Sequence, residues 1–205
     1  MKIRIIAYNI ALCLSTTTAA QAQDFDPYAG FGVGIFGLEL KTPSVTQKNT
    51  VVGEYLKFGV HFNDMIAAEL RIGGTGTGTS SYSAGTPITT AQGTFPSPVS
   101  FNYSMEASYF VSYLTRLRYE VAQDFHLYGL VGGTTIKVKG TFSVPGIKGT
   151  SGTTSGLSYG AGVEYVFAER LNAGAEWVQY WTDVKTGSTS KARVWGMVGS
   201  ISYNF

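Results

Sequence analysis

The 205-residue chain carries 15 Lys and Arg residues against 13 Asp and Glu, and only 14% of its residues are charged. Nucleic acid is therefore not an expected partner, because phosphate binding needs a concentrated basic surface. The two histidines, His61 and His126, show no metal-ligand spacing, and Cys13 is the single cysteine, so neither a metal site nor a cofactor is expected. The chain is instead rich in Gly (26), Tyr (13) and Phe (12).

The first 22 residues have the order of a secretory signal peptide. Lys2 and Arg4 precede an apolar stretch from Ile5 to Leu14, and Ala20-Gln21-Ala22 offers a cleavage site with small residues. The stretch is shorter than the roughly 20 apolar residues that a spanning helix needs. We therefore predict a signal peptide at 1–22 and one domain at 23–205, which has equal numbers of basic and acidic residues.

After residue 22 the apolar residues recur at every second position, and no window keeps a helical period. This pattern predicts strands. We expect eight, at residues 28–40, 51–62, 66–73, 104–121, 125–139, 157–167, 171–184 and 192–205. In the first strand the alternation changes face between Ile35 and Phe36, which predicts a bulge near Gly37.

The expected connections alternate between short and long. Brief turns lie at residues 63–64, 122–124 and 168–170, whereas residues 41–50, 74–101, 140–156 and 185–191 form longer connections, mostly rich in Gly, Ser and Thr. The longest, 74–101, opens with a Gly-Thr repeat and has only Tyr82 and Phe95 as aromatics before Phe101. It is predicted to bury too little apolar area to order itself.

Charged residues share one face of the predicted strands, opposite large apolar residues such as Leu56, Phe58 and Leu70. The charged set comprises Lys57, Glu69, Arg71, Arg116, Arg118, Glu120, Glu164 and Glu176, accompanied by His61 and Asn172. The alternation fits two architectures, a soluble barrel with an apolar interior and a membrane barrel with a polar interior. The predicted signal peptide and the C-terminal aromatic favour the membrane barrel, whose inward charges should pair and fill the narrow lumen as a structural network.

Aromatic residues cluster toward both ends of the strands, which predicts two interfacial girdles. We expect one girdle at Phe62, Tyr119, Phe125, Tyr165, Phe167 and Phe205, and the other at Phe101, Tyr103, Trp177, Tyr180, Trp181 and Trp195.

Three short segments carry a family resemblance. They are the entry Pro27-Tyr28-Ala29-Gly30, the Asn63-Asp64 turn followed by Glu69-Leu70-Arg71, and the ending Tyr203-Asn204-Phe205. With these, the whole of residues 23–205 resembles the OmpA-like and opacity-protein-like barrels of bacterial outer membranes. The resemblance implies an all-β, eight-stranded antiparallel up-and-down transmembrane barrel, monomeric, in the outer membrane of a Gram-negative bacterium.

The resemblance also implies an assembly signal and a topology. Ile201, Tyr203 and Phe205 stand where the family carries the signal that the barrel-assembly machinery reads. Short turns face the periplasm in such barrels and long loops face outward. The partners implied are outer-membrane lipids, lipopolysaccharide and an extracellular ligand or host surface.

The function expected from the sequence is a structural or surface-interaction role through the outer loops, without enzymatic activity. Two alternatives stay open, a narrow channel and an enzyme that modifies lipid A. Deacylases of that kind carry a His-x-Ser pair, and His126-Leu127-Tyr128 lacks the serine. Glu164 with Glu176 could form an acid/base pair and His61 with Glu69 a dyad, but charges in a lumen are needed for structure alone.

Overall fold

The computed structural model describes residues 25–41, 46–90, 93–147, 149–185 and 190–205, so the predicted signal peptide lies outside the described residues. These residues form eleven strands. The strands are β1 (Asp26–Lys41), β2 (Thr46–His61), β3 (Ile66–Thr75), β4 (Gly78–Tyr82), β5 (Pro87–Thr90), β6 (Gly93–Pro96), β7 (Phe101–Ala122), β8 (Phe125–Phe142), β9 (Thr150–Ala168), β10 (Leu171–Lys185) and β11 (Lys191–Asn204). No helix in the described part of the chain is long and apolar enough to cross a membrane.

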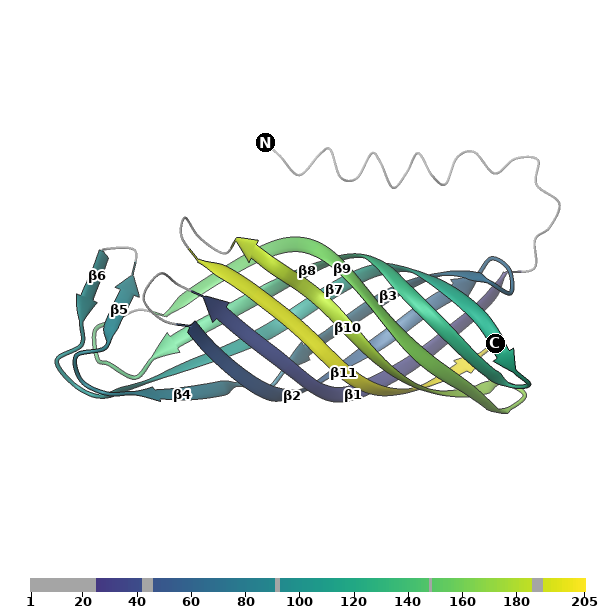
Figure 1. Ribbon diagram of the computed structural model, residues 1–205, viewed down its shortest axis with the longest axis horizontal. Helices are drawn as coiled ribbons and strands as arrows, with labels where there is room; N and C mark the ends of the chain where they lie inside the picture. The colour runs from purple at the N-terminus through teal and green to yellow at the C-terminus, as the bar shows by residue number, and fades with distance from the viewer. Residues whose placement is uncertain (1–24, 42–45, 91–92, 148, 186–189) are drawn as a thin grey trace, which may run out of the picture.

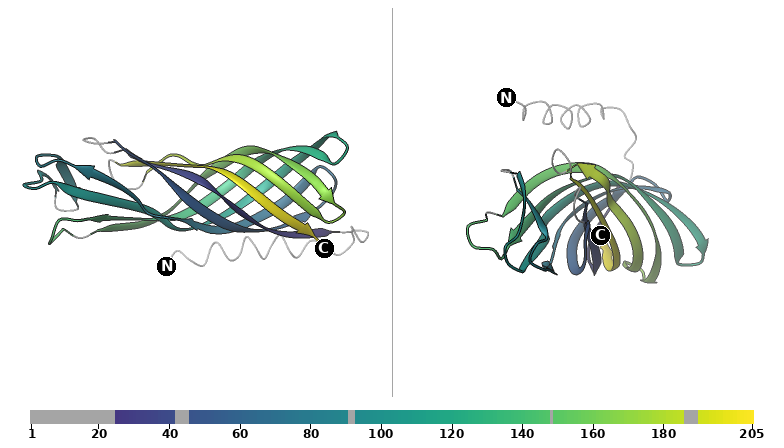
Figure 2. Two further views of the ribbon diagram at one scale, coloured as in Figure 1. Left: turned by 90° about the horizontal axis from the view of Figure 1, so that it is seen from below. Right: turned by 60° about the vertical axis from the view of Figure 1, so that its left-hand side comes forward.

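Eight of the strands form a closed antiparallel ring (Figures 1 and 2). Their order is β3-β2-β1-β11-β10-β9-β8-β7, and the pairing of β3 with β7 closes it. The ring has no free edge, so every strand finds backbone partners on both sides. The predicted all-β, eight-stranded antiparallel barrel is confirmed.

The two ends of the barrel differ (Figure 1). The turn end carries the tight connections β2–β3, β7–β8 and β9–β10 together with the C-terminus, and the loop end carries the longer connections. Local chemistry explains the tight turns. Asn63 Oδ1 accepts hydrogen bonds from the backbone N–H groups of Met65 (2.9 Å) and Ile66 (2.8 Å), and Asp124 adopts a positive φ of 61°, which Asp tolerates better than most residues.

Several strands continue past their predicted bounds at the loop end. The β7–β8 ladder reaches Tyr103 opposite Phe142, and the β8–β9 ladder reaches Gly140 opposite Thr150. Residues 140–142 and 150–156, expected in a loop, therefore belong to strands. Ladder hydrogen bonds join backbones, so polar Ser and Thr side chains do not end a strand.

The prediction that residues 74–101 do not order themselves is wrong. β4 pairs with β7, extending its ladder from Met105 to Phe101, while β5 and β6 form a separate hairpin. The Tyr82 ring stacks on Phe101 with centroids 5.3 Å apart, and Ile88 is only 1% exposed. The segment gains its order by adding to an existing strand, which requires little apolar area of its own.

The predicted bulge near Gly37 is also wrong. β1 pairs with β11 from Tyr28 to Lys41 without a shift of register. Phe36 is fully buried because the alternation simply continues and the lumen becomes apolar at this height. Shifts of register occur elsewhere, twice in the β7–β8 ladder and twice between Gln179 and Val184 of β10 in its pairing with β11.

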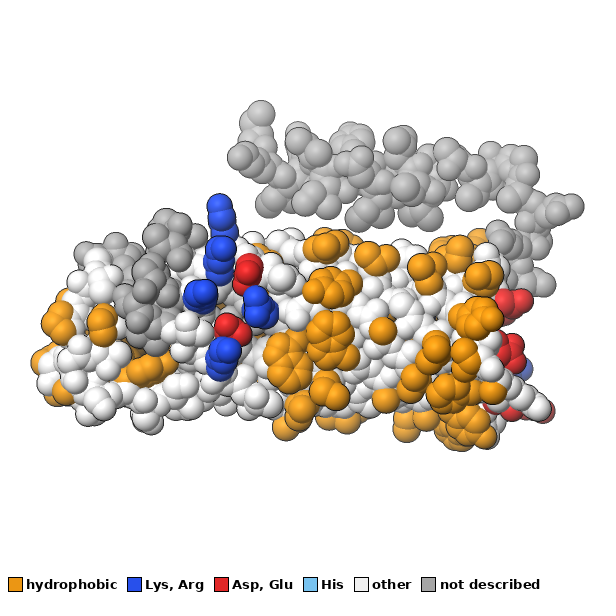
Figure 3. Space-filling view, in the orientation of Figure 1, with side chains coloured by type: hydrophobic (Ala, Val, Ile, Leu, Met, Phe, Trp, Pro, Cys, Tyr) orange, Lys and Arg blue, Asp and Glu red, His pale blue; other side chains and the backbone are white. Residues whose placement is uncertain are grey.

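Large apolar side chains cover the outer wall as a band, which Figure 3 shows in orange on one face. The aromatics predicted for the turn end are exposed or half-buried on this wall. At the loop end only Trp177 and Trp195 face outward. The other four members of the predicted loop-end girdle are buried instead: Phe101, Tyr103, Tyr180 and Trp181. The prediction of a loop-end girdle is therefore wrong for these four residues. The shifts of register in β10 account for the consecutive burial of Tyr180 and Trp181.

Candidate functional site

The lumen contains a layer of charged side chains in the half nearer the turn end. Lys57 (β2), Glu69 and Arg71 (β3), Arg116 (β7), Glu164 (β9) and Glu176 (β10) are all buried there. Asn172 is buried as well, and Lys57 Nζ donates to Ser200 Oγ at 3.1 Å. These six charged residues were all predicted to face inward, and the structure places them together in one layer.

Arg71 lies at the centre of this charged layer. Its guanidinium forms ion pairs with Glu69 and Glu176, and Nη2 donates to Glu176 Oε2 at 2.9 Å. Tyr55 donates to Glu176 Oε1 at 2.7 Å and Tyr128 donates to Oε2 at 2.9 Å. Both carboxylate oxygens of Glu176 are therefore satisfied, as burial of a charge requires.

Glycines on neighbouring strands let these tyrosines lie flat across the wall. Tyr55 lies opposite Gly32, and a Cβ at Gly32 would come within 2.5 Å of Tyr55 Cζ. Tyr128 lies opposite Gly162, where the corresponding distance is also 2.5 Å. Each ring occupies the space that a side chain would need, and its hydroxyl reaches Glu176. Part of the high glycine content thus serves the packing of the lumen.

A second ion pair joins Arg116 to Glu164, with Nη2 2.8 Å from Oε2. The Arg116 guanidinium also lies over the ring of Tyr128, 3.9 Å from its centroid. Because Tyr128 donates to Glu176, this ring connects the two groups of charges. Five buried ions and their tyrosines thereby form one contact chain across the lumen.

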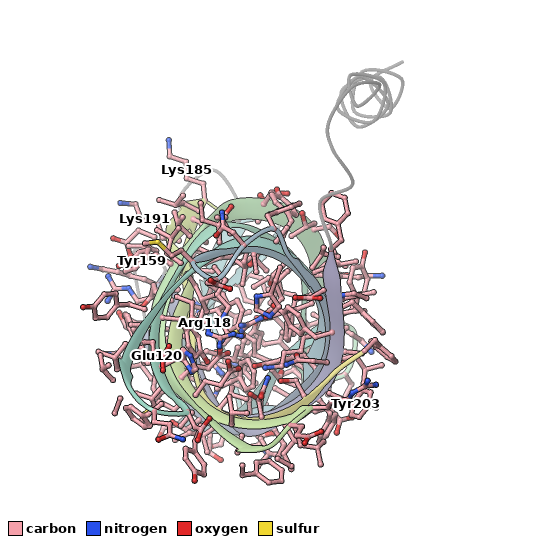
Figure 4. The ribbon with its side chains drawn as sticks, turned by 90° about the vertical axis from the view of Figure 1, so that its right-hand side faces the viewer. Arg118, Glu120, Tyr159, Lys185, Lys191 and Tyr203 are labelled. Carbon is pink, nitrogen blue, oxygen red and sulfur yellow. The ribbon has the colours of Figure 1, made fainter. Side chains whose placement is uncertain are left out.

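The remaining predicted residues lie at the mouth of the turn end. Arg118 Nη2 is 2.8 Å from His126 Nε2, and Figure 4, which looks along the barrel from this end, shows Arg118 inside the ring. Glu120 is exposed and His61 is half-buried. These residues stand outside the buried charge layer, because the lumen opens to solvent at the mouth.

An aromatic layer fills the lumen on the loop-end side of the charges. Phe36 stacks on Tyr180 with centroids 5.8 Å apart, and Phe110 lies 5.2 Å from Tyr180. Trp181 Nε1 donates to the carbonyl of Thr134 at 3.0 Å, so its polar atom is satisfied in an otherwise apolar setting. The sequence does not predict this layer, because alternation alone does not say where an interior changes from polar to apolar.

A cavity of about 420 Å³ lies at the loop end, beyond the aromatic layer. Its apolar wall includes Leu40, Tyr82, Ile88, Phe101, Tyr103, Val138 and Phe142, and its polar wall includes Gln47, Thr86, Ser151, Thr153 and Thr154. Burial raises the pKa of Tyr82 above its ordinary value. The connection between β3 and β7 contributes Thr86, Pro87 and Ile88 to the lining. The cavity therefore exists only because this connection is ordered.

The described residues that line this cavity include no His, Cys, Asp or Glu. Within the described ranges, no group of three or more such residues is placed to hold a metal ion. His126, considered for the deacylase alternative, lies at the turn end beside Arg118. The loop-end cavity offers shape, aromatic surface, hydrogen-bonding groups and one cation, Lys185.

Comparison with known proteins agrees with this architecture. Residues 9–205 match the family model described as an outer membrane protein beta-barrel domain. The chain belongs to this family. It is thereby placed in the outer membrane of a Gram-negative bacterium, as predicted. No curated protein matches the sequence significantly.

Solved structures share the fold at low sequence identity. Neisserial surface protein A aligns with a TM-score of 0.57 and 11% identity, over 87% of this chain and 97% of that one. Ail, the attachment invasion locus protein of Yersinia pestis, aligns at 0.50 and 18%, over 88% and 99%. The N-terminal barrel of OprF from Pseudomonas aeruginosa aligns at 0.50 and 13%, over 85% and 97%. At such identities the likeness concerns the fold alone.

Proposed function

We propose that this outer-membrane protein acts at the cell surface by binding a small amphipathic ligand at the loop end, without catalysing a reaction. The observation that carries the proposal is the loop-end cavity of about 420 Å³, a size within the range of small-molecule sites. Aromatic rings would pack on the apolar body of the ligand, and the hydroxyl and amide groups on the wall would bind its polar part.

The filled lumen supports binding over conduction. The charge layer and the aromatic layer lie in series below the cavity, and Arg71, Arg116, Phe36 and Trp181 are each no more than 2% exposed. Eight strands enclose an interior that side chains can fill completely. A ligand that enters from the loop end would therefore stop at the aromatic layer. We expect no stepwise conductance in planar bilayers.

Two glycines allow a matched test of the cavity. Gly152 lines it opposite Val138, and a Cβ at Gly152 would meet nothing within 4 Å. Gly152→Phe should fill the cavity without disturbing the wall. Gly129 has equally open surroundings but lies between Tyr128 and Leu130, whose side chains face the lumen, so its own position faces the membrane. Gly129→Phe is the control.

The measurement is saturation-transfer NMR on the barrel in phospholipid nanodiscs, with a panel of nitrophenyl glycosides and fatty-acyl amino acids. We expect at least one compound to bind the native and Gly129→Phe proteins and to lose binding to Gly152→Phe. Equal signals from all three proteins across the panel would refute the cavity as the ligand site. Mass spectrometry of lipid A from cells with and without the gene tests the enzymatic alternative, and we expect identical spectra.

A further inference from the structure

The outer wall carries a concentrated group of charges near the loop end, on β10, β11, β1 and β2. It consists of Lys41, Lys48, Lys185, Lys191 and Arg193 together with Glu39 and Asp183. We call this group the basic strip. Five cations stand against two carboxylates, although residues 23–205 as a whole have no net charge. Figure 3 shows Lys and Arg side chains gathered beside the apolar band on this face.

The strand register divides the strip into two rows. In the row nearer the apolar band, Glu39 lies opposite both Lys48 and Arg193. Glu39 Oε2 is 3.7 Å from Lys48 Nζ, and Asp183 Oδ1 accepts from Arg193 Nη2 at 3.1 Å. Both carboxylates of the strip are therefore engaged by cations of this row.

The second row consists of three lysines on neighbouring strands. Lys41 lies directly opposite Lys191, and Lys191 directly opposite Lys185. Figure 4 shows Lys185 and Lys191 pointing away from the lumen. No carboxylate oxygen of a described residue lies within 4.0 Å of these three ammonium groups. Like charges directly opposite destabilise an antiparallel pair, and an anion from outside would remove that repulsion.

The position of the strip relative to the apolar band indicates the source of the anion. Trp195 follows Arg193 by two residues, and its indole covers Gly37 of β1. Next come Ile35 and Met197, paired across the strands and 44% and 54% exposed, which belong to the band. A Trp between an apolar band and charged residues is typical of a membrane interface. At about 3.3 Å per residue, Lys191 lies roughly 13 Å along the strand from Trp195, or about 10 Å along the axis of a barrel whose strands tilt by about 40°. The lysine row therefore lies on the headgroup side of Trp195.

We propose that the basic strip binds the phosphate groups of lipid A, the phosphorylated glycolipid of the outer leaflet. The lysines would contact the phosphates, while the acyl chains would pack on the apolar band directly below. A soluble polyanion could bind the lysines, but it has no acyl chains to pack on the apolar band. Lys185 also lines the loop-end cavity, whereas Lys41 and Lys191 do not, so a change at Lys41 and Lys191 tests the strip without altering the lining of the cavity.

The opposite face of the barrel provides a matched control. Lys139 Nζ lies 3.9 Å from Glu106 Oε1, and Lys137 Nζ lies over the Tyr109 ring, 5.9 Å from its centroid. Unlike the lysine row, these two cations already have partners within the wall. Lys137→Gln with Lys139→Gln removes the same charge as Lys41→Gln with Lys191→Gln, at sites that the proposal does not involve.

The experiment is native mass spectrometry of the full folded barrel in a non-ionic detergent, titrated with diphosphoryl lipid A. Lys41→Gln with Lys191→Gln should weaken binding about 20- to 30-fold, from about fivefold for each cation beside an anionic lipid surface. Lys41→Arg with Lys191→Arg keeps the charge and should bind nearly as the native protein does. Heat-modifiable gel mobility verifies that each variant is folded.

Three results would overturn the proposal. An equal loss in the Lys137/Lys139 control would assign the effect to net charge instead of to this strip. Equal affinity of the native barrel for dephosphorylated lipid A would assign binding to acyl chains alone. Binding of a soluble sulfated polysaccharide to the strip as tightly as lipid A would assign it to an extracellular polyanion.

Discussion

Arg71 on β3 and Glu176 on β10 meet across the lumen, with Arg71 Nη2 2.9 Å from Glu176 Oε2 and a second contact between Nη1 and Oε1. The two strands are separated by β2, β1 and β11 in the ring, so the pair joins opposite walls. Both side chains are almost fully buried. An ion pair in this position holds the barrel together across its width and closes the lumen.

Removing the cation of that pair should destabilise the barrel strongly. Arg71→Ala leaves the carboxylates of Glu69 and Glu176 buried without their partner, at an expected cost of about 3 to 5 kcal/mol. The measurement is the free energy of unfolding by denaturant in detergent micelles. Arg193→Ala, which breaks the exposed pair with Asp183, should cost no more than about 1 kcal/mol. Equal unfolding midpoints for both variants would contradict a buried ionic layer.

The packing of Tyr55 over Gly32 should appear as an energetic coupling. Gly32→Val places atoms where the ring lies and should move the Tyr55 hydroxyl from Glu176, at a cost of about 1 to 3 kcal/mol. In a Tyr55→Ala background the same valine should cost much less, because the ring is gone. A double-mutant cycle of unfolding free energies measures the coupling. Additive effects would mean that ring and glycine do not interact.

A charge on the lipid-facing wall should impair assembly. Leu70→Arg places a cation on the apolar band, where it costs about 2 to 4 kcal/mol near the middle of the bilayer. Val99 is comparably exposed, at 50% against 41% for Leu70, but lies in the loop-end connection. Val99→Arg should therefore assemble normally. The yield of heat-modifiable protein in outer-membrane fractions distinguishes the two, and equal yields would place Leu70 outside the membrane.

The C-terminal aromatic should matter more for assembly than other aromatics at the turn end. Phe205 is 66% exposed, its N–H donates to the carbonyl of Pro27, and its ring packs edge-on against Tyr203. Phe205→Lys should lower the amount of assembled barrel through loss of the predicted signal. Phe167→Lys, at another exposed turn-end position, should lower it far less. Quantitative blots of membrane fractions make the comparison, and equal losses would refute a special role for the C-terminus.

An epitope inserted after Ala84 should be accessible on intact cells. Ala84 and Gly85 form a turn in which Thr86 N donates to Ser83 O and Gly85 N donates to Ser97 O. The insertion breaks this turn but leaves the eight-stranded ring intact, because the turn lies outside it. Antibody labelling of whole cells measures access. Labelling only after the outer membrane is permeabilised would reverse the expected topology, with the loop end then facing the periplasm.

The sequence by itself determined the strands and the inward face of the charged half of the barrel. Alternation has a period of two in every strand, and charges such as Glu69 and Arg71 cannot face lipid cheaply, so one face of each strand was assigned from residues alone. Local signals also determined the tight turns, because Asn63 acts on its own neighbours.

Only the tertiary structure decided which residues meet across the lumen and where the interior becomes apolar. Arg71 and Glu176 are 105 residues apart, and their contact depends on how closure of the ring staggers the strands. The same closure places Phe36 against Tyr180. The sequence around each of these two residues would also allow its side chain to face the outer wall. The position of β4 likewise depends on β7, because β4 pairs with Phe101–Met105, the part of β7 that extends beyond its pairing with β3.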